Sequence, residues 1–223
     1  EALERAVRSG PVERLLDYPG CIAEMRKAMA ALSTSGRTQP LRQIVPLREG
    51  AVFGVMPGDL CALDTFGAKL ISVFHDPGSH GRSRHRGVVA AFDFASGELV
   101  CLADAEPITA IRTACATAAA TDSLARADAA TLLVMGAGLQ AETHLRALMQ
   151  VRRFREVLVW GRDSARTQGF AERMSRELGF AVTPIGDAQE AVRRADVICT
   201  VSGSREPILL GEWVRPGTHV NLV

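Results

Sequence analysis

The chain has 223 residues, of which 47% are hydrophobic and 23% are charged, and its formal net charge at pH 7 is +1. This composition is typical of a soluble globular protein and argues against a disordered or membrane protein. The balanced charge, the single tyrosine and the two tryptophans argue against a nucleic-acid-binding surface. A chain of this length suffices for two small domains, each with its own core.

The sequence predicts a cytoplasmic protein. Its longest apolar runs fall short of the roughly 20 residues that a membrane span needs. Its first residues, Glu-Ala-Leu-Glu-Arg-Ala, are too charged for a signal peptide. The five cysteines are widely spaced and include no Cys-x-x-Cys pair, which favours reduced thiols over disulfides and predicts no metal site.

The first half of the chain is predicted to combine helices with a mainly antiparallel sheet. Apolar residues at helical spacing over 11–35, interrupted at Pro19-Gly20, predict one long helix or a helical hairpin. Short apolar segments separated by turn residues then predict five strands, at 43–46, 51–56, 68–74, 88–93 and 99–103. The polar, glycine-rich stretch 75–87 is expected to be an exposed loop, with a solvated loop favoured over a functional lid.

The second half of the chain alternates between strands and helices. A helix is expected from Pro107 to about Arg126, with small side chains that allow close packing. Strands are then predicted at 131–135, 156–160, 181–184 and 197–201, and helices at 139–149, 164–178 and 188–195. This alternation predicts an α/β fold with a Rossmann-type parallel sheet and crossover helices, and it places the domain boundary near residue 126.

A glycine-rich motif stands at the first strand-to-helix junction of the second half. Gly136-Ala137-Gly138-Leu139-Gln140-Ala141 directly follows an apolar strand and opens a helix. At such a junction the N–H groups of the helix start face a pyrophosphate, and alanine in the last position still permits close helix packing. A plain glycine turn is the alternative. We predict a dinucleotide site with contacts from Gly136, Ala137, Gly138, Leu139 and Gln140.

The residues after the next strand bear on the choice of cofactor. NAD-binding units commonly end this strand with an acidic residue, whereas here Gly161, Arg162 and Asp163 follow Trp160. Glycine removes the repulsion of a 2′-phosphate, and Arg162 can pair with that phosphate and stack on adenine. NADP(H) is therefore favoured over NAD(H). Alternatively, Arg162 is solvated, Asp163 or Ser164 caps the next helix, and either cofactor binds.

The last predicted strand also ends in candidate cofactor residues. Thr200, Val201 and Ser202 stand at its carboxyl end, where ligands bind in open α/β sheets. We expect them to border the nicotinamide ribose.

Three cations in the first half have apolar neighbours in the sequence. Arg42 precedes a strand, Lys69 lies within one, and Arg112 lies in the first turns of the Ala-rich helix. A charge in an apolar segment needs a partner or a ligand, and a cation near a helix start opposes the helix dipole. Each is either a structural ion-pair residue or a substrate contact, and the three together would form a carboxylate clamp.

Collinear motifs along nearly the whole chain resemble the ornithine cyclodeaminase and mu-crystallin family. The matching stretches are Gln39-Pro40-Leu41-Arg42, Gly54-Val55-Met56-Pro57, Ala68-Lys69-Leu70, Ile108-Thr109-Ala110-Ile111-Arg112-Thr113-Ala114, the Gly136 turn, Ala195-Asp196-Val197-Ile198, Glu206-Pro207-Ile208-Leu209 and Pro216-Gly217-Thr218-His219-Val220-Asn221.

The resemblance implies roles for four of these residues. Arg42, Lys69 and Arg112 match the family's substrate-carboxylate ligands, with Lys69 as the catalytic candidate, and Thr113 matches a position associated with the cofactor phosphates. It also implies a substrate-binding and dimerisation domain at residues 1–126, a dinucleotide-binding domain at 127–223, and a homodimer. The family's chains continue past the position of Val223, into a loop that carries an aspartate in the cyclodeaminases and then into further helices.

One departure within the family favours a reductase. Ornithine cyclodeaminases resemble Glu-Leu-Met-Pro where this chain has Gly54-Val55-Met56-Pro57, so the carboxylate beside the substrate is missing. The mu-crystallin branch, with NADPH-dependent ketimine reductases, has glycine there. We therefore expect reduction of the C=N bond of a small cyclic or open-chain imino acid. The alternatives are an ornithine cyclodeaminase that uses NAD and a non-catalytic protein that binds NADPH or small ligands.

Overall fold

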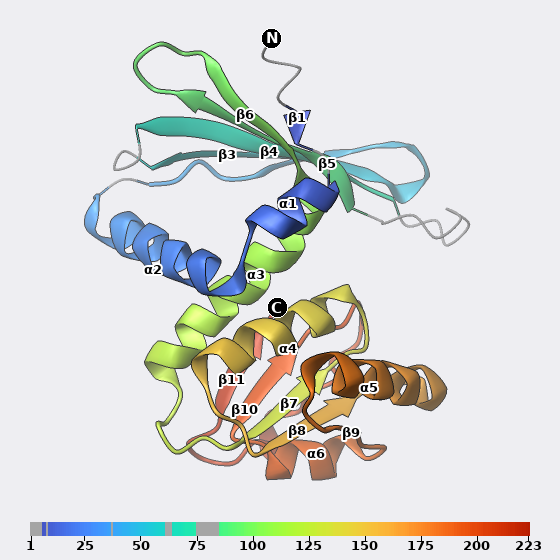
Figure 1. The fold of residues 1–223 in the computed structure, drawn as a ribbon. Coiled ribbons are helices and arrows are strands. Elements are labelled where there is room, and N and C mark those ends of the chain that lie inside the picture. The colour runs from blue at the N-terminus through green and yellow to red at the C-terminus, as the bar shows by residue number, and fades with distance from the viewer. Residues whose placement is uncertain (1–5, 8, 37, 61–63, 75–84) are drawn as a thin grey trace. The chain divides into compact units, whose positions relative to one another are not determined.

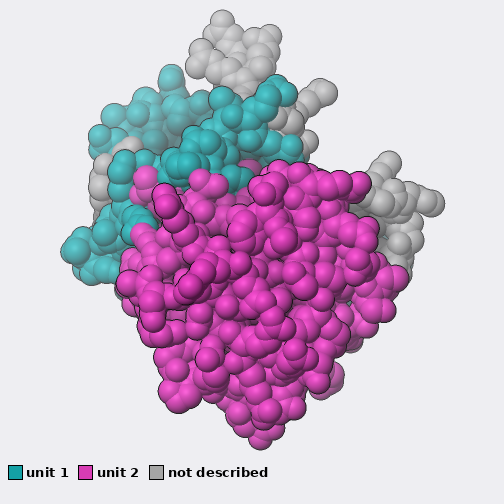
Figure 2. Space-filling view, turned by 60° about the horizontal axis from the view of Figure 1, so that its bottom comes forward, with its two compact units in different colours: residues 1–20, 24–109 teal, residues 21–23, 110–223 magenta. Residues whose placement is uncertain are grey.

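The structure is a computed structural model that describes all residues except 1–5, 8, 37, 61–63 and 75–84. The chain forms two compact units, Glu1–Gly20 with Glu24–Thr109 and Cys21–Ala23 with Ala110–Val223 (Figure 2). The main division falls within a helix, between Thr109 and Ala110, whereas the domain boundary near residue 126 stays a prediction. None of the helices in the described ranges is long and apolar enough to span a bilayer.

Two helices, α1 (Ser9–Leu15) and α2 (Tyr18–Thr34), replace the single long helix that was one alternative. The sequence suggested a break at Pro19-Gly20, whereas the structure has it at Leu16 and Asp17. The Asp17 carboxylate caps α2 by accepting the N–H of Gly20 at 2.7 Å. Pro19 is tolerated in this first turn because N–H groups there have no partner within the helix.

The predicted antiparallel sheet is confirmed as a six-stranded sheet (Figure 1). Its strands are β1 (Ala6–Val7), β2 (Gln43–Pro46), β3 (Val52–Leu60), β4 (Thr65–Val73), β5 (His85–Asp93) and β6 (Leu99–Asp104), in the order β1-β6-β5-β4-β3-β2. Among the strand pairs of the described residues in this sheet, only that of β1 with β6 is parallel. A short 3-10 helix, η2 (Arg48–Gly50), connects β2 with β3.

The sheet of unit 1 has longer strands than the sequence predicted. The predicted loop 75–87 is wrong at its end, because residues 85–87 belong to β5 and pair with the end of β4. Residues 75–84 of that loop lie outside the described residues. Since side chains alternate along a strand, Lys69 shares the face of Ile71, which is buried, and Phe66 lies on the opposite face.

Helix α3 (Ala105–Leu124) starts two residues before the predicted Pro107. The carboxylate of Asp104 accepts the N–H of Glu106 at 2.9 Å, which extends the helix start, and Pro107 lies within the first turn. The small residues Ala114, Cys115 and Ala118 are fully buried, as the Ala-rich pattern predicted.

The parallel sheet of unit 2 confirms the Rossmann-type prediction. Its elements alternate as β7 (Thr131–Met135), α4 (Leu139–Val151), β8 (Glu156–Trp160), α5 (Ser164–Leu178), β9 (Val182–Pro184), α6 (Ala188–Arg194), β10 (Val197–Thr200), η4 (Gly211–Trp213) and β11 (His219–Leu222). All pairs in the order β11-β10-β7-β8-β9 are parallel. Because the winding direction reverses after β9, α4 and α5 cover one face and α6 the other (Figure 1).

The amino end of this sheet is held together by one carboxylate. Asp196, just before β10, accepts the N–H groups of Ala130 and Thr131 at 2.9 and 3.0 Å. It also pairs with Arg126 at 2.8 Å and Arg215 at 3.3 Å. Burial works to raise the pKa of Asp196, but the two N–H groups and the two guanidinium groups lower it below its ordinary value. The Ala195-Asp196-Val197-Ile198 motif therefore has a structural role, at the edge opposite the candidate site.

Candidate functional site

The carboxyl ends of three adjacent strands, β7, β8 and β10, frame the candidate cofactor site. From β7 the chain first adds β8 and β9 on one side of the sheet and then β10 and β11 on the other side. The strand order therefore reverses between β7 and β10. In open parallel sheets ligands bind in the crevice at such a switch point. The glycine-rich turn follows β7, and the residues from Gly161 and from Val201 onward follow the other two strands.

Gly136 occupies a position that only glycine fits. Its φ of 146° lies in the region that L side chains rarely adopt, and a Cβ there would lie 2.7 Å from the carbonyl oxygen of Val201. Its N–H donates to the carbonyl of Trp160 at 2.8 Å, and the N–H of Val201 donates to the carbonyl of Met135 at 3.0 Å. The turn is thus fixed between the ends of β8 and β10.

The amino end of α4 fits the pyrophosphate of a dinucleotide. Gly138 is the N-cap, and no side chain caps this 13-residue helix. Among the described residues, a Cβ at Gly138 would have only a guanidinium nitrogen of Arg166 within 4 Å, at 3.9 Å, so the space beside this glycine is open. In the first turn, the buried side-chain oxygen of Gln140 has no hydrogen-bond partner among the described residues, and a donor on a ligand would satisfy it.

The end of β8 leaves no room for a side chain at position 161. A Cβ on Gly161 would lie 2.5 Å from the hydroxyl of Thr167, which donates to the carbonyl of Asp163 at 2.7 Å. The acidic residue that NAD-binding units place at this strand end is therefore sterically excluded here. Arg162 is exposed, and the Asp163 carboxylate caps α5 by accepting the N–H of Arg166 at 3.0 Å.

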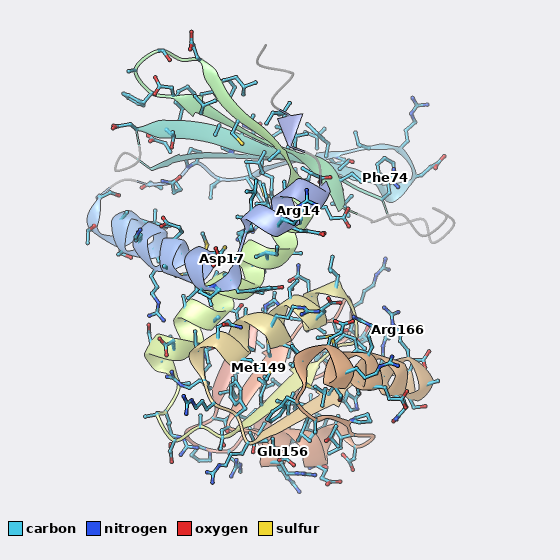
Figure 3. All side chains as sticks on the ribbon, in the orientation of Figure 1. Arg14, Asp17, Phe74, Met149, Glu156 and Arg166 are labelled. Atoms are coloured by element: carbon cyan, nitrogen blue, oxygen red, sulfur yellow. The ribbon has the colours of Figure 1, made fainter. Side chains whose placement is uncertain are left out.

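Sequence reasoning missed Arg166, which lies in the first turn of α5 (Figure 3). Its Nε donates to the carbonyl oxygen of Ala137 at 3.3 Å, so its guanidinium group touches the glycine-rich turn. The sequence held a signal for it, since a cation in the first turn of a helix opposes the helix dipole. That argument singled out Arg112, which the structure places eighth in α3 and so beyond the first turn, whereas it does apply to Arg166, the third residue of α5.

His144 fixes the first turn of α4 from inside unit 2. It is fully buried; Nδ1 lies 2.6 Å from the carbonyl oxygen of Gln140, and Nε2 lies 3.1 Å from the hydroxyl of Thr117 on α3. Because a carbonyl only accepts, Nδ1 carries the proton and Nε2 accepts from Thr117. Burial lowers the pKa of His144 to about 4, although the bond to Gln140 works against it, so the ring is neutral at pH 7.

The buried His144 predicts a loss of stability in mild acid. Between pH 6.5 and about 4 the unfolded chain binds a proton at this residue that the folded chain does not, so stability present above pH 6.5 is lost as the pH falls. From pH 7 to pH 5 this histidine should remove about 2 kcal/mol from the free energy of unfolding. Urea unfolding of the wild type and of His144→Gln at both pH values measures the difference. Equal pH dependence in the two proteins would contradict the assignment.

Of the three predicted cations, Arg42 and Lys69 belong to unit 1 and Arg112 belongs to unit 2. Lys69 lies in the middle of β4, half-buried, and its Nζ donates to the hydroxyl of Thr109 on α3 at 3.3 Å. The Thr109 hydroxyl in turn donates to the carbonyl of Ala105 at 2.5 Å. Met56 on β3 pairs with Lys69 on β4. Strand β2 begins at Gln43, which pairs with Val55, the neighbour of Met56. Arg42 is exposed and directly precedes β2.

Arg112 and Thr113 lie further along α3, in unit 2. Arg112 is exposed and follows Thr109 by three residues, so the two side chains share a face of the helix. Thr113 is half-buried. At the end of β10, the Thr200 hydroxyl donates to the carbonyl of Asn221 at 3.4 Å.

The space beside Gly54 is filled by aliphatic side chains. A Cβ on Gly54 would lie 3.2 Å from Cγ1 of Ile71 and 3.5 Å from Cδ1 of Ile44. Both isoleucines and Gly54 lie on the face of the sheet that carries Lys69. A longer side chain at this position would have to displace Ile71, so the chain provides no carboxylate there.

Comparison with known proteins identifies the family. The sequence model of the ornithine cyclodeaminase/mu-crystallin family matches residues 7–223. The chain belongs to this family. The ketimine reductase mu-crystallin of Rattus norvegicus is 37% identical over 189 residues, which cover 84% of this chain and 59% of that protein. A Delta(1)-pyrroline-2-carboxylate reductase of Paracoccus denitrificans is 32% identical over 221 residues, covering 97% and 69%.

A solved structure of another family member supports the fold. The Thermococcus litoralis Delta(1)-pyrroline-2-carboxylate reductase, in complex with NADH and L-proline, superposes with a TM-score of 0.91 and 29% identity. The match covers 98% of this chain and 68% of that chain. The present chain thus spans about 59% of the length of the rat mu-crystallin and about two thirds of the archaeal reductase. The α/β architecture predicted from the sequence is that of the family.

Proposed function

We propose that this protein is a nicotinamide-dependent reductase of small imino acids, of the pyrroline- or piperideine-2-carboxylate type. The observation that carries the proposal is the turn at Gly136, which excludes a side chain and leaves the start of α4 uncapped for a pyrophosphate. The relatives named as ketimine and pyrroline-2-carboxylate reductases support the substrate class.

We propose NADP(H) as the preferred cofactor, with NAD(H) as the alternative. Two features support this preference: the steric exclusion of a carboxylate at Gly161 and the two arginines, Arg162 and Arg166, close to the end of β8. The relative from Thermococcus litoralis binds NADH, which is why NAD(H) stays open. The reduced cofactor, when bound, supplies a hydride to the carbon of the C=N bond.

The role proposed for Lys69 combines substrate binding with proton transfer. With Arg42 and Arg112 it binds the substrate carboxylate, and its ammonium group donates a proton to the imine nitrogen. The half-buried position on β4 reduces competition from water, and the bond to Thr109 limits the conformations of the long side chain. The aliphatic surroundings of Gly54 support imine reduction over the cyclodeaminase reaction. This position has no carboxylate, whereas the cyclodeaminase pattern has a glutamate here.

Steady-state kinetics test the proposed function. We expect the protein to oxidise NADPH, followed by absorbance, when pyrroline-2-carboxylate or piperideine-2-carboxylate is added. NADH provides the cofactor control, and an ammonia assay with ornithine tests the cyclodeaminase reaction. NADPH consumption with either imine supports the reductase. Ammonia release from ornithine without NADPH oxidation would refute it, and binding of NADPH with neither reaction would favour a non-catalytic binding protein.

We further propose a homodimer formed through the sheet of unit 1. An aromatic cluster supports it: Phe66 stacks on Phe92 with ring centroids 5.4 Å apart and meets Phe94 edge-on at 6.3 Å. Phe94 is 64% exposed, and Phe66 lies on the sheet face opposite Ile71. An exposed aromatic surface of this kind is typical of a protein interface. Sedimentation velocity at several concentrations measures the oligomeric state.

A further inference from the structure

Arg166 is held against the glycine-rich turn by one hydrogen bond of its backbone and one of its side chain. Its backbone N–H donates to the Asp163 carboxylate at 3.0 Å, and its Nε donates to the carbonyl of Ala137 at 3.3 Å. Helical side chains tilt toward the amino end of their helix, so this third residue of α5 points toward the end of β8. The guanidinium group is therefore held at the edge where the candidate cofactor site lies.

The charge of Arg166 has no carboxylate partner among the described residues. The backbone N–H of Arg166 donates to the carboxylate of Asp163, whereas its guanidinium group donates to the carbonyl of Ala137. Arg173 on the same helix, by contrast, pairs with Glu142 at 2.9 Å and Glu177 at 3.3 Å. A cation in the first turn of a helix costs stability because it opposes the helix dipole. A bound anion would offset that cost.

The position of Arg166 favours the 2′-phosphate of an adenosine ribose over other anions. In Rossmann units the adenosine ribose lies beside the end of the second strand, which is β8 here. Arg162 follows that strand and Arg166 comes four residues later. A Cβ on Gly161 would lie 3.9 Å from the Cβ of Ala137, so the strand end and the turn are neighbours. The two guanidinium groups outweigh the single negative charge of Asp163 between them.

We propose that Arg166 is a specificity-determining residue that, with Arg162, binds the 2′-phosphate of NADP(H). The inference rests on the proposed dinucleotide site and extends it to a residue on the following helix. Nη1 and Nη2 remain to donate to phosphate oxygens while Nε holds Ala137. The same contact keeps the guanidinium in one orientation, which reduces the entropy lost on binding.

Calorimetric titration with four ligands tests the proposal: NADP⁺, NAD⁺, 2′-AMP and 5′-AMP. Loss of a charged hydrogen bond costs about 1.5–3 kcal/mol, so Arg166→Ala should weaken binding of NADP⁺ and 2′-AMP by about 10- to 100-fold. Binding of NAD⁺ and 5′-AMP should change by less than about twofold. Arg176→Ala is the matched control, because it removes the same charge from the last turn of the same helix and should leave all four affinities unchanged.

Three outcomes would overturn the inference. Equal weakening of NADP⁺ and NAD⁺ by Arg166→Ala would mean that Arg166 supports only the turn or the pyrophosphate. Unchanged binding of all four ligands would mean that it contacts none of them. If the wild type binds no dinucleotide, the proposed function fails together with this inference. If the wild type binds NADP⁺ and the variant is unaffected, only the inference fails. Thermal melting of both variants verifies that they are folded.

Discussion

Lys69→Met is expected to abolish turnover while NADPH binding stays intact. Methionine has a similar length and keeps the apolar stem, but it has no ammonium group to bind the substrate carboxylate or to protonate the imine. A positioned proton donor commonly contributes about 10²–10⁴-fold to the rate, and the lost carboxylate contact adds to that. Lys69 belongs to β4 in unit 1, whereas the proposed dinucleotide contacts come from the glycine-rich turn and the strand ends of unit 2, so cofactor affinity should not change. Single-turnover kinetics and NADPH titration measure the two quantities separately.

The control for this variant is Lys27→Met. Lys27 lies on α2, is exposed and pairs with Glu24 at 2.7 Å, an exposed ion pair of little energetic weight. We expect it to retain full activity. Retained turnover in Lys69→Met would remove this lysine from the mechanism, and loss of NADPH binding would show that the substitution disturbs more than the substrate.

Gly136→Ala is expected to destabilise unit 2 and to abolish dinucleotide binding. Alanine at a φ of 146° is strained, and its Cβ would lie 2.7 Å from a backbone oxygen of Val201, which cannot move without disrupting β10. Strain and overpacking together should lower the free energy of unfolding by about 3 kcal/mol. Any relaxation that relieves the contact displaces the turn from the start of α4. Urea unfolding and calorimetric titration with NADP⁺ measure both effects.

Gly169→Ala is the matched control, with an expected effect of the opposite sign. Gly169 lies inside α5, is exposed, and has nothing within 4 Å of the position of an added Cβ. Alanine should stabilise the helix by about 0.5–1 kcal/mol and leave cofactor binding unchanged. If Gly136→Ala were as stable and bound NADP⁺ as tightly as this control, the described geometry of the turn would be wrong.

The sequence predicted the parallel sheet well because its strands are buried on both faces. The strands at 131–135 and 156–160 were predicted to the residue, since continuous apolar runs ended at turn residues on both sides. The final strand, β11, was missed because its four residues, His-Val-Asn-Leu, are too few to show a strand pattern and include no continuous apolar run. Its pairing with β10 comes from the sheet and not from its own pattern.

Boundaries in unit 1 were predicted less well, because neighbours decide them. Strands β3 and β4 pair over nine residues each, through glycines and through Pro57, which the local pattern reads as turn signals. Tertiary pairing overrides these local preferences. The helix break moved to Asp17 for a different reason: a capping side chain, rather than the following proline, sets the start of α2.

The amino-acid sequence by itself determined the fold class, the glycine-rich turn after β7, the family and the candidate cations Arg42, Lys69 and Arg112. These depend on local patterns of apolar residues, on glycine and on motifs that lie within a few residues of each other.

The tertiary structure alone decided which neighbours these residues have. Only the packing of α5 shows that Thr167 excludes a side chain at Gly161, and that Arg166 reaches the carbonyl of Ala137 from another helix. Only the sheet register shows that Ile71 fills the space beside Gly54. The physical reason is that all three effects are contacts between residues separated along the chain, and a one-dimensional pattern does not record such contacts.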